Sequence, residues 1–169
     1  VMAVEERAEE IIDFFETAID DLEQRTGDIP NEEKSTCYVG GIAYKGPHGL
    51  QSTEPAYPPF MFVNARNVAY DPNKKLSELQ HADVAKEMIL AWDPEVLFVD
   101  VATLQSEPEA SALYELANDT AYRDLSAVRN GEVYGVLPYN WYTRNFGSII
   151  ADAYFVGKVL YPDRFRDID

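Results

Sequence analysis

Apolar residues recur at spacings of three and four near the start of the chain. This period predicts one long helix over residues 4–25, because such positions fall on a single face of an α-helix. Gly27 and Pro30 follow the pattern and end it. Acidic side chains occupy most of the other positions, so we expect the helix to lie along the rest of the protein by its apolar stripe. That stripe consists of Ala8, Ile11, Ile12, Phe15, Ala18, Ile19 and Leu22.

Four short β-rich runs follow, at residues 36–42, 67–70, 96–101 and 132–137. Each run is nearly continuous in apolar residues, which is typical of strands buried on both faces of a parallel sheet. Helical patterns separate the runs, and the clearest of them spans residues 146–161. This alternation predicts an α/β fold: a three-layer, Rossmann-like unit with a mostly parallel sheet of four or more strands, preceded by the long helix.

The loops that leave the predicted strands are the expected place of a binding site, because α/β folds bind ligands outside the carboxyl ends of their strands. The loop of residues 43–58 is longer than most connections in compact domains, so it is either functional or disordered. It carries Tyr44, Lys45 and His48 among its glycines. The glycines lack dinucleotide or P-loop spacing, which disfavours a nucleotide site. A surface position is the alternative for His48, and more so for His81.

A second loop, PYNWYTRN, follows the last predicted strand and is rich in aromatic side chains. Consecutive large aromatic residues cannot all face one interior, so some of them are expected to be exposed. Such a pattern favours stacking on a flat ligand or on a partner surface, with packing inside the loop as the alternative. The candidate ligand-binding residues of this loop are Tyr139, Asn140, Trp141, Tyr142 and Arg144.

Charge and cysteine content narrow the choice of partners. With 30 acidic and 14 basic residues the chain has a formal net charge of −16, which makes nucleic acid and anionic membrane surfaces poor partners. Cys37 is the only cysteine of the sequence, which excludes an internal disulfide and a cluster of thiolate metal ligands. Because Cys37 lies early in a predicted strand, we interpret it as a packed core thiol.

Asp100 ends a predicted buried strand and is a candidate general base. Cys37 or Ser52 would then be the nucleophile. The order and spacing of these residues match no triad signature, and an α/β enzyme domain is kept as an alternative.

Several segments, taken in their order along the chain, resemble the substrate-binding proteins of ABC importers that take up iron–siderophore complexes, haem or cobalamin. These proteins have two α/β lobes joined by one long rigid helix. The segments are CYVGGIAY, STEPAYPPFMFVNARNVA, AWDPEVLFV, AYRDLSAVRNGEVYGVLP and GSIIADAYFVGKVLYPDRF. The resemblance implies that residues 1–26 are the end of the lobe-connecting helix and that residues 30–169 are the C-terminal ligand-binding lobe. The N-terminal lobe would lie outside this chain.

The resemblance also implies a function. The protein would be the substrate-binding component of an ABC importer, acting outside the cytoplasm, without enzymatic activity and without a cofactor of its own. It would hold an iron complex, haem or a corrinoid in the cleft between two lobes and deliver it to a membrane permease. A metal-chelatase or nitrogenase-like assembly lobe is a further alternative. Ala65 and Arg66 stand where the family often has two glycines, and the YKGPHG loop is an elaboration, so the ligand is left open.

Two interactions with other proteins follow from the same resemblance. Glu54, in STEP, stands where the family has an acidic residue that docks each lobe onto arginines of the permease. The alternative is that a glutamate near a helix start is simply favoured by the helix dipole. Because a missing lobe would leave apolar surface exposed, we also expect self-association through the cleft side or the first helix.

Overall fold

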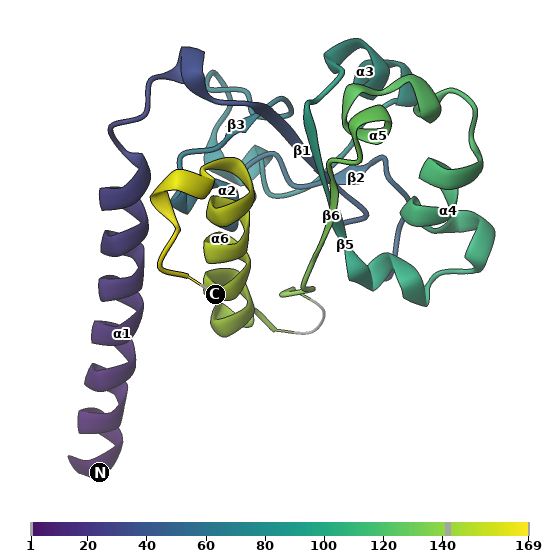
Figure 1. Ribbon diagram of the computed structural model, residues 1–169. Coiled ribbons are helices and arrows are strands. Elements are labelled where there is room, and N and C mark those ends of the chain that lie inside the picture. The colour runs from purple at the N-terminus through teal and green to yellow at the C-terminus, as the bar shows by residue number, and fades with distance from the viewer. Residues whose placement is uncertain (1, 141–142, 169) are drawn as a thin grey trace.

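The computed structural model describes residues 2–140 and 143–168. Figure 1 shows a central sheet with helices on both sides and the long helix α1 at one flank. The sheet has four strands in the order β3-β1-β5-β6, and all neighbouring strands are parallel. Its central strands are β1 (Thr36–Gly40) and β5 (Val96–Asp100), with β6 (Val133–Val136) at one edge. The predicted α/β fold with a parallel sheet is confirmed.

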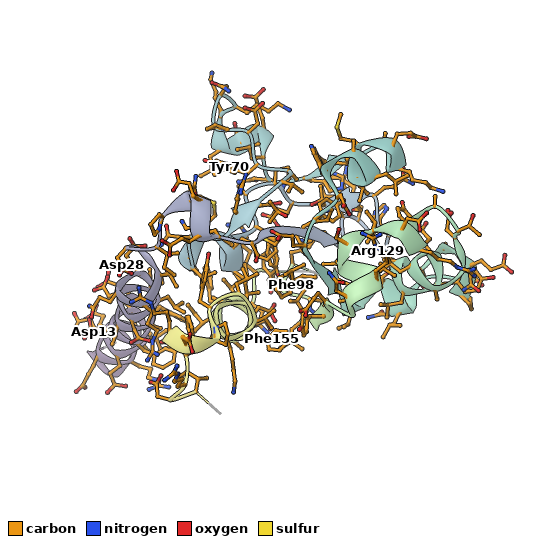
Figure 2. All side chains as sticks on the ribbon, turned by 45° about the horizontal axis from the view of Figure 1, so that its top comes forward. Asp13, Asp28, Tyr70, Phe98, Arg129 and Phe155 are labelled. Atoms are coloured by element: carbon orange, nitrogen blue, oxygen red, sulfur yellow. The ribbon has the colours of Figure 1, made fainter. Side chains whose placement is uncertain are left out.

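The sheet separates two apolar cores, because alternate residues of a strand point to opposite faces. Val39 and Phe98 face one core, which also contains apolar residues of two helices and the end of α1. Tyr38 and Leu97 face the other core, which contains residues of three helices. The helices of the first face are α2 (Pro58–Phe62) and α6 (Phe146–Leu160), and those of the second are α3 (Lys86–Trp92), α4 (Ala112–Asn118) and α5 (Ser126–Asn130). Figure 2 shows Phe98 near the centre of the molecule, between these layers.

Three very short strands differ from the sequence prediction. β3 is limited to Arg66–Asn67, because a turn closed by the Tyr70 N–H and the Asn67 carbonyl (3.2 Å) ends it within the predicted run. β2 (Ser52–Thr53) and β4 (Ala82–Asp83) form an antiparallel pair that was not predicted. Two residues are too few to show a strand period, so this pairing left no pattern in the sequence.

The helix α1 (Met2–Thr26) is one continuous helix, as predicted, but it packs only by its second half. Ala18 and Leu22 are buried, whereas Ile11 is 41% exposed and Ile12 is 53% exposed. The expectation that the whole stripe lies along the protein is therefore wrong. The reason is length: α1 extends beyond the end of α6, against which it packs (Figure 1). Among the described helices, none has both the length and the apolar content needed to cross a bilayer.

The packed half of α1 is fixed to the C-terminal segment by Arg25. Its guanidinium donates to both carboxylate oxygens of Asp167 (2.6 and 2.7 Å) and to Asp21 (2.8 Å). It also lies over the ring of Phe165, with its central carbon 5.2 Å from the ring centroid. Asp21 accepts a second hydrogen bond from the Tyr154 hydroxyl of α6 (2.7 Å). Side chains of α6 and of the C-terminal segment thus hold the second half of α1 in place, whereas its first half extends beyond them.

Candidate functional site

A pocket of about 520 Å³ lies where β1, β5 and β6 end, which is the edge of the sheet expected to bind ligands. It brings together five of the predicted site residues from both loops, together with Glu54. The lining residues are Ala43, Tyr44, Lys45, Glu54, Ser77, Gln80, His81, Tyr139, Asn140 and Arg144. A different hollow, of about 420 Å³, lies near the start of β1 beside Lys34 and Arg66 and contains none of the predicted ligand-binding residues.

Three predicted ligand-binding residues are not among the described residues that line the larger pocket. Trp141 and Tyr142 lie outside the residues that the structure describes. His48 lines a different hollow, beside Gln105 and Glu107, and its Nε2 donates to the backbone carbonyl of Tyr44 (2.6 Å). His48 therefore supports the loop that carries Tyr44 and Lys45 and does not line the pocket itself.

The backbone turns sharply between Tyr44 and Gly46. The Tyr44 N–H donates to the Gly46 carbonyl (3.0 Å), and both Lys45 (φ 56°) and Gly46 (φ 140°) have positive φ. Glycine adopts this conformation without the steric cost that a side chain would add, which explains its place here. The turn brings the Lys45 ammonium to 5.1 Å from the centroid of the Tyr44 ring, in cation–π geometry.

Tyr44 also stacks on His81, with ring centroids 4.1 Å apart and an angle of 16° between the rings. Ser52 donates its hydroxyl proton to the Ile42 carbonyl (2.7 Å), so the His81 Nε2, 3.2 Å from Ser52 Oγ, is the donor in their hydrogen bond. This arrangement leaves His81 Nδ1 as an acceptor in the neutral ring, and burial lowers the pKa of His81, which favours that neutral form. The sequence analysis favoured a surface position for His81. The short β2–β4 pairing that positions this side chain leaves no pattern in the sequence.

Glu54 lies in the interior of the pocket, not on the rim. Its side chain is 3% exposed, and its carboxylate accepts a hydrogen bond from the Tyr139 hydroxyl. Burial raises the pKa of Glu54 to about 7, while the Tyr139 hydrogen bond and the positive charge of Arg144 oppose this rise. A carboxylate that docks onto a permease would have to reach the surface, and Glu54 does not do so in this structure, so docking by Glu54 stays an untested prediction. The cause of the burial is local: the preceding Thr53 donates to the Val39 carbonyl of β1 (2.6 Å) and draws the segment inward.

Two further buried carboxylates lie close to the strand ends. Asp100 is 1% exposed and caps the next helical turn by accepting from the Ala102 N–H (2.8 Å). Asp152 of α6 accepts from the Leu137 N–H (2.9 Å) and from the Tyr57 hydroxyl (3.3 Å). Burial raises the pKa of each carboxyl to about 6. Both groups have backbone partners, so they fix the chain where it leaves β5 and β6.

The candidate nucleophiles Cys37 and Ser52 are not placed for catalysis in the pocket. Cys37 is fully buried near the start of β1, the end of the strand opposite the pocket, and burial raises the pKa of its thiol. The Ser52 hydroxyl donates to a backbone carbonyl. Within the described residues, no group of three or more His, Cys, Asp and Glu side chains is arranged to hold a metal ion. What the pocket offers a solute is a buried carboxylate, two exposed cations and an aromatic stack.

Comparisons with known proteins identify the fold and the family. A family model described as periplasmic binding protein matches residues 1–139. An ABC transporter solute binding protein from Sulfurospirillum deleyianum is similar over 98% of this chain and 49% of its own, with 26% identity and a TM-score of 0.70. No curated protein sequence matches this chain.

Two more distant structures share the fold. The molybdate periplasmic binding protein MolA of Haemophilus influenzae is similar over 97% of this chain and 47% of its own, with 20% identity and a TM-score of 0.69. A protein of an Fe3+-hydroxamate transport system from Saccharomonospora viridis is similar over 91% and 49%, with 19% identity and a TM-score of 0.62. The chain therefore spans about half the length of the solved structures that it matches.

Proposed function

This chain belongs to the periplasmic binding protein family, and on that premise we propose that it forms the C-terminal lobe of the solute-binding component of an ABC importer. Residues 30–169 would be the lobe and residues 1–26 the end of the helix that connects it to a second lobe. The carboxyl edge of the sheet, with its pocket, would form one wall of the cleft between them. The protein would act outside the cytoplasm and deliver its solute to a membrane permease.

The proposed solute is a metal complex with anionic oxygens: an iron complex, haem or a corrinoid. The observation that carries this proposal is the placement of Lys45 and Arg144 in one pocket of a chain whose net charge is −16. On so acidic a protein, two cations in one pocket provide a local site for negative charge. The aromatic pair of Tyr44 and His81, with the Lys45 ammonium near the Tyr44 ring, adds an apolar wall for the organic part of such a ligand.

The solutes named for the structural relatives are compatible with this choice. MolA is described as bound to molybdate, and the protein from Saccharomonospora viridis belongs to an Fe3+-hydroxamate transport system. Both solutes contain a metal surrounded by oxygen atoms. A pocket of about 520 Å³ that is one wall of a cleft suits a ligand that extends beyond it into the second lobe.

The proposal can be tested by titrating the chain with a panel of ferric siderophores, haem and cobalamin, and by following tryptophan fluorescence and binding heat. We expect saturable binding of at least one complex, and about tenfold or greater weakening when Lys45 and Arg144 are both replaced by alanine. The matched control is the Lys75→Ala, Arg129→Ala double variant, which removes two exposed cations outside the pocket. Equal affinities of the two double variants would contradict the proposed site.

A further inference from the structure

The charges of the pocket are arranged by depth. Lys45 and Arg144 are exposed, whereas Glu54 is almost completely buried and still contributes to the pocket lining. A solute that entered would meet positive charge at the opening and a carboxylate beneath it. This arrangement is unexpected for a site that serves only anions, because an ionised carboxylate repels them.

The carboxylate of Glu54 has room for another hydrogen bond. A carboxylate has about four acceptor positions, and Tyr139 is the one side chain of the described residues that donates to it. Of the charged groups around it, Arg144 favours the ionised form and the buried Asp100 disfavours it. Since that hydrogen bond occupies the Tyr139 proton, the hydroxyl is not available to donate to a solute.

A purely structural role for Glu54 does not explain why this position carries an ionisable carboxyl in place of an amide. Tyr139 is also held by its backbone carbonyl, which accepts from the Asn145 N–H (2.8 Å), and by packing on Tyr57, with ring centroids 6.0 Å apart. A neutral glutamine could accept the Tyr139 hydrogen bond equally well. An ionised carboxylate costs more to bury than an amide unless it is paired with donors or positive charge. A donor supplied by the solute would remove this cost.

We propose that Glu54 selects the solute by accepting a hydrogen bond from a donor that the solute carries, while Lys45 and Arg144 bind oxygens of its metal-coordinating part. The inference rests on the proposed transport function and defines the solute class more narrowly. The donor is an ammonium, whose positive charge pairs with the ionised carboxylate. The solute class is a metal complex that presents negatively polarised oxygens to the opening of the pocket and a donor to its interior.

A pair of probes that differ in the charge of the donor tests this inference. The gallium(III) complex of desferrioxamine B carries a free primary ammonium on a flexible chain, and its N-acetylated derivative has a neutral amide N–H in place of the ammonium. Both are diamagnetic, so binding to the 169-residue chain can be followed by NMR shifts. At pH 8 we expect the ammonium form to bind about tenfold more tightly, as for one hydrogen bond between charged groups. The preference should shrink at pH 6, where Glu54 is largely protonated.

Variants connect the preference to one residue. Glu54→Gln should abolish the difference between the two probes, whereas Asp152→Asn, which removes a buried carboxylate outside the pocket lining, should retain it. Equal affinities of the two probes for the unmodified chain would overturn the inference while leaving the transport function standing. The same holds if Glu54→Gln retains the preference. If neither probe nor any complex of the wider panel binds, the proposed function fails and the inference fails with it.

Discussion

The hydroxyl of Tyr139 donates a hydrogen bond to the buried carboxylate of Glu54, although 85 positions separate the two residues in the sequence. The contact joins the loop after β6 to the segment after β2, so it ties together two of the loops that form the pocket. It also places a titratable group with a pKa of about 7 inside the proposed binding site. The chemistry of the pocket thus depends on pH in the neutral range.

Protein stability should fall as the pH rises from about 5 to 8. Glu54, Asp100 and Asp152 have pKa values of about 6 to 7 in the folded protein, against ordinary values of 4.5 for Glu and 3.8 for Asp. In this pH range the three carboxyls bind more protons in the folded state than in the unfolded state, so the free energy of unfolding decreases with pH. The lowered pKa of His81 acts in the opposite direction, but it is one group against three. Carboxyls whose pKa values are lowered, such as Asp21, change the free energy of unfolding only below this pH range.

Urea unfolding at several pH values measures this effect. Glu54→Gln should flatten the dependence, by up to about 3 kcal/mol between pH 5 and pH 8, which is the equivalent of a pKa raised from 4.5 to about 7. An exposed control, Glu109→Gln, should leave the slope unchanged. A stability that rises steadily from pH 5 to pH 8 would contradict the assignment.

Replacing Arg25 by alanine should loosen α1 from the lobe. The variant loses the bonds to Asp21 and Asp167, and the Arg25 side chain is only 18% exposed. We expect a loss of about 1–2 kcal/mol in the free energy of unfolding and faster amide exchange at residues 164–168. Arg7→Ala is the control, because its pair with Glu10 is highly exposed and should matter by less than about 0.5 kcal/mol. Equal effects of the two variants would refute the anchoring role.

Reversing the charge of Glu54 separates a site residue from a docking residue. Glu54→Lys would bury an ammonium beside Tyr139 and close to Arg144, which should lower the melting temperature and abolish solute binding. A surface docking carboxylate would instead leave stability and solute affinity intact and impair only uptake. Thermal melts and solute titrations therefore distinguish the two roles, and a normal melt with normal affinity would favour docking.

The projecting half of α1 should promote self-association. Ile12 is 53% exposed and Phe14 is 62% exposed, on a helix segment that extends away from the rest of the lobe. Exposed apolar side chains of this size favour contact with a second apolar surface. Light scattering should show oligomers at high concentration, and Ile12→Glu with Phe14→Glu should shift them to monomers. A wild-type chain that is strictly monomeric at high concentration would contradict this prediction.

The sequence predicted those parts of the structure that have a local pattern. The apolar run around Phe98 predicted a buried strand, and the periodic residues before Gly27 predicted the long helix. Tyr44, Lys45 and Arg144 were found because the carboxyl ends of parallel strands meet at one edge of a sheet.

What could not be predicted depends on contacts between distant segments. The pairing of Thr53 with Ala82 places both Glu54 and His81, yet two paired residues produce no period in the sequence. The burial of Glu54 was therefore missed, and His81 was discounted. Likewise, the exposure of Ile11 depends on where α1 passes the end of α6, which no pattern within α1 can show.

Mapping of the bound solute on the chain tests the central claim most directly. Two-dimensional NMR spectra recorded with a diamagnetic gallium siderophore would report which amides shift on binding. We predict that the shifts concentrate at residues 43–45, 54, 80–81, 139–140 and 144, around the pocket at the carboxyl ends of the strands. Shifts that concentrate instead around the hollow beside Lys34 and Arg66 would contradict the account, because that hollow lies near the start of β1.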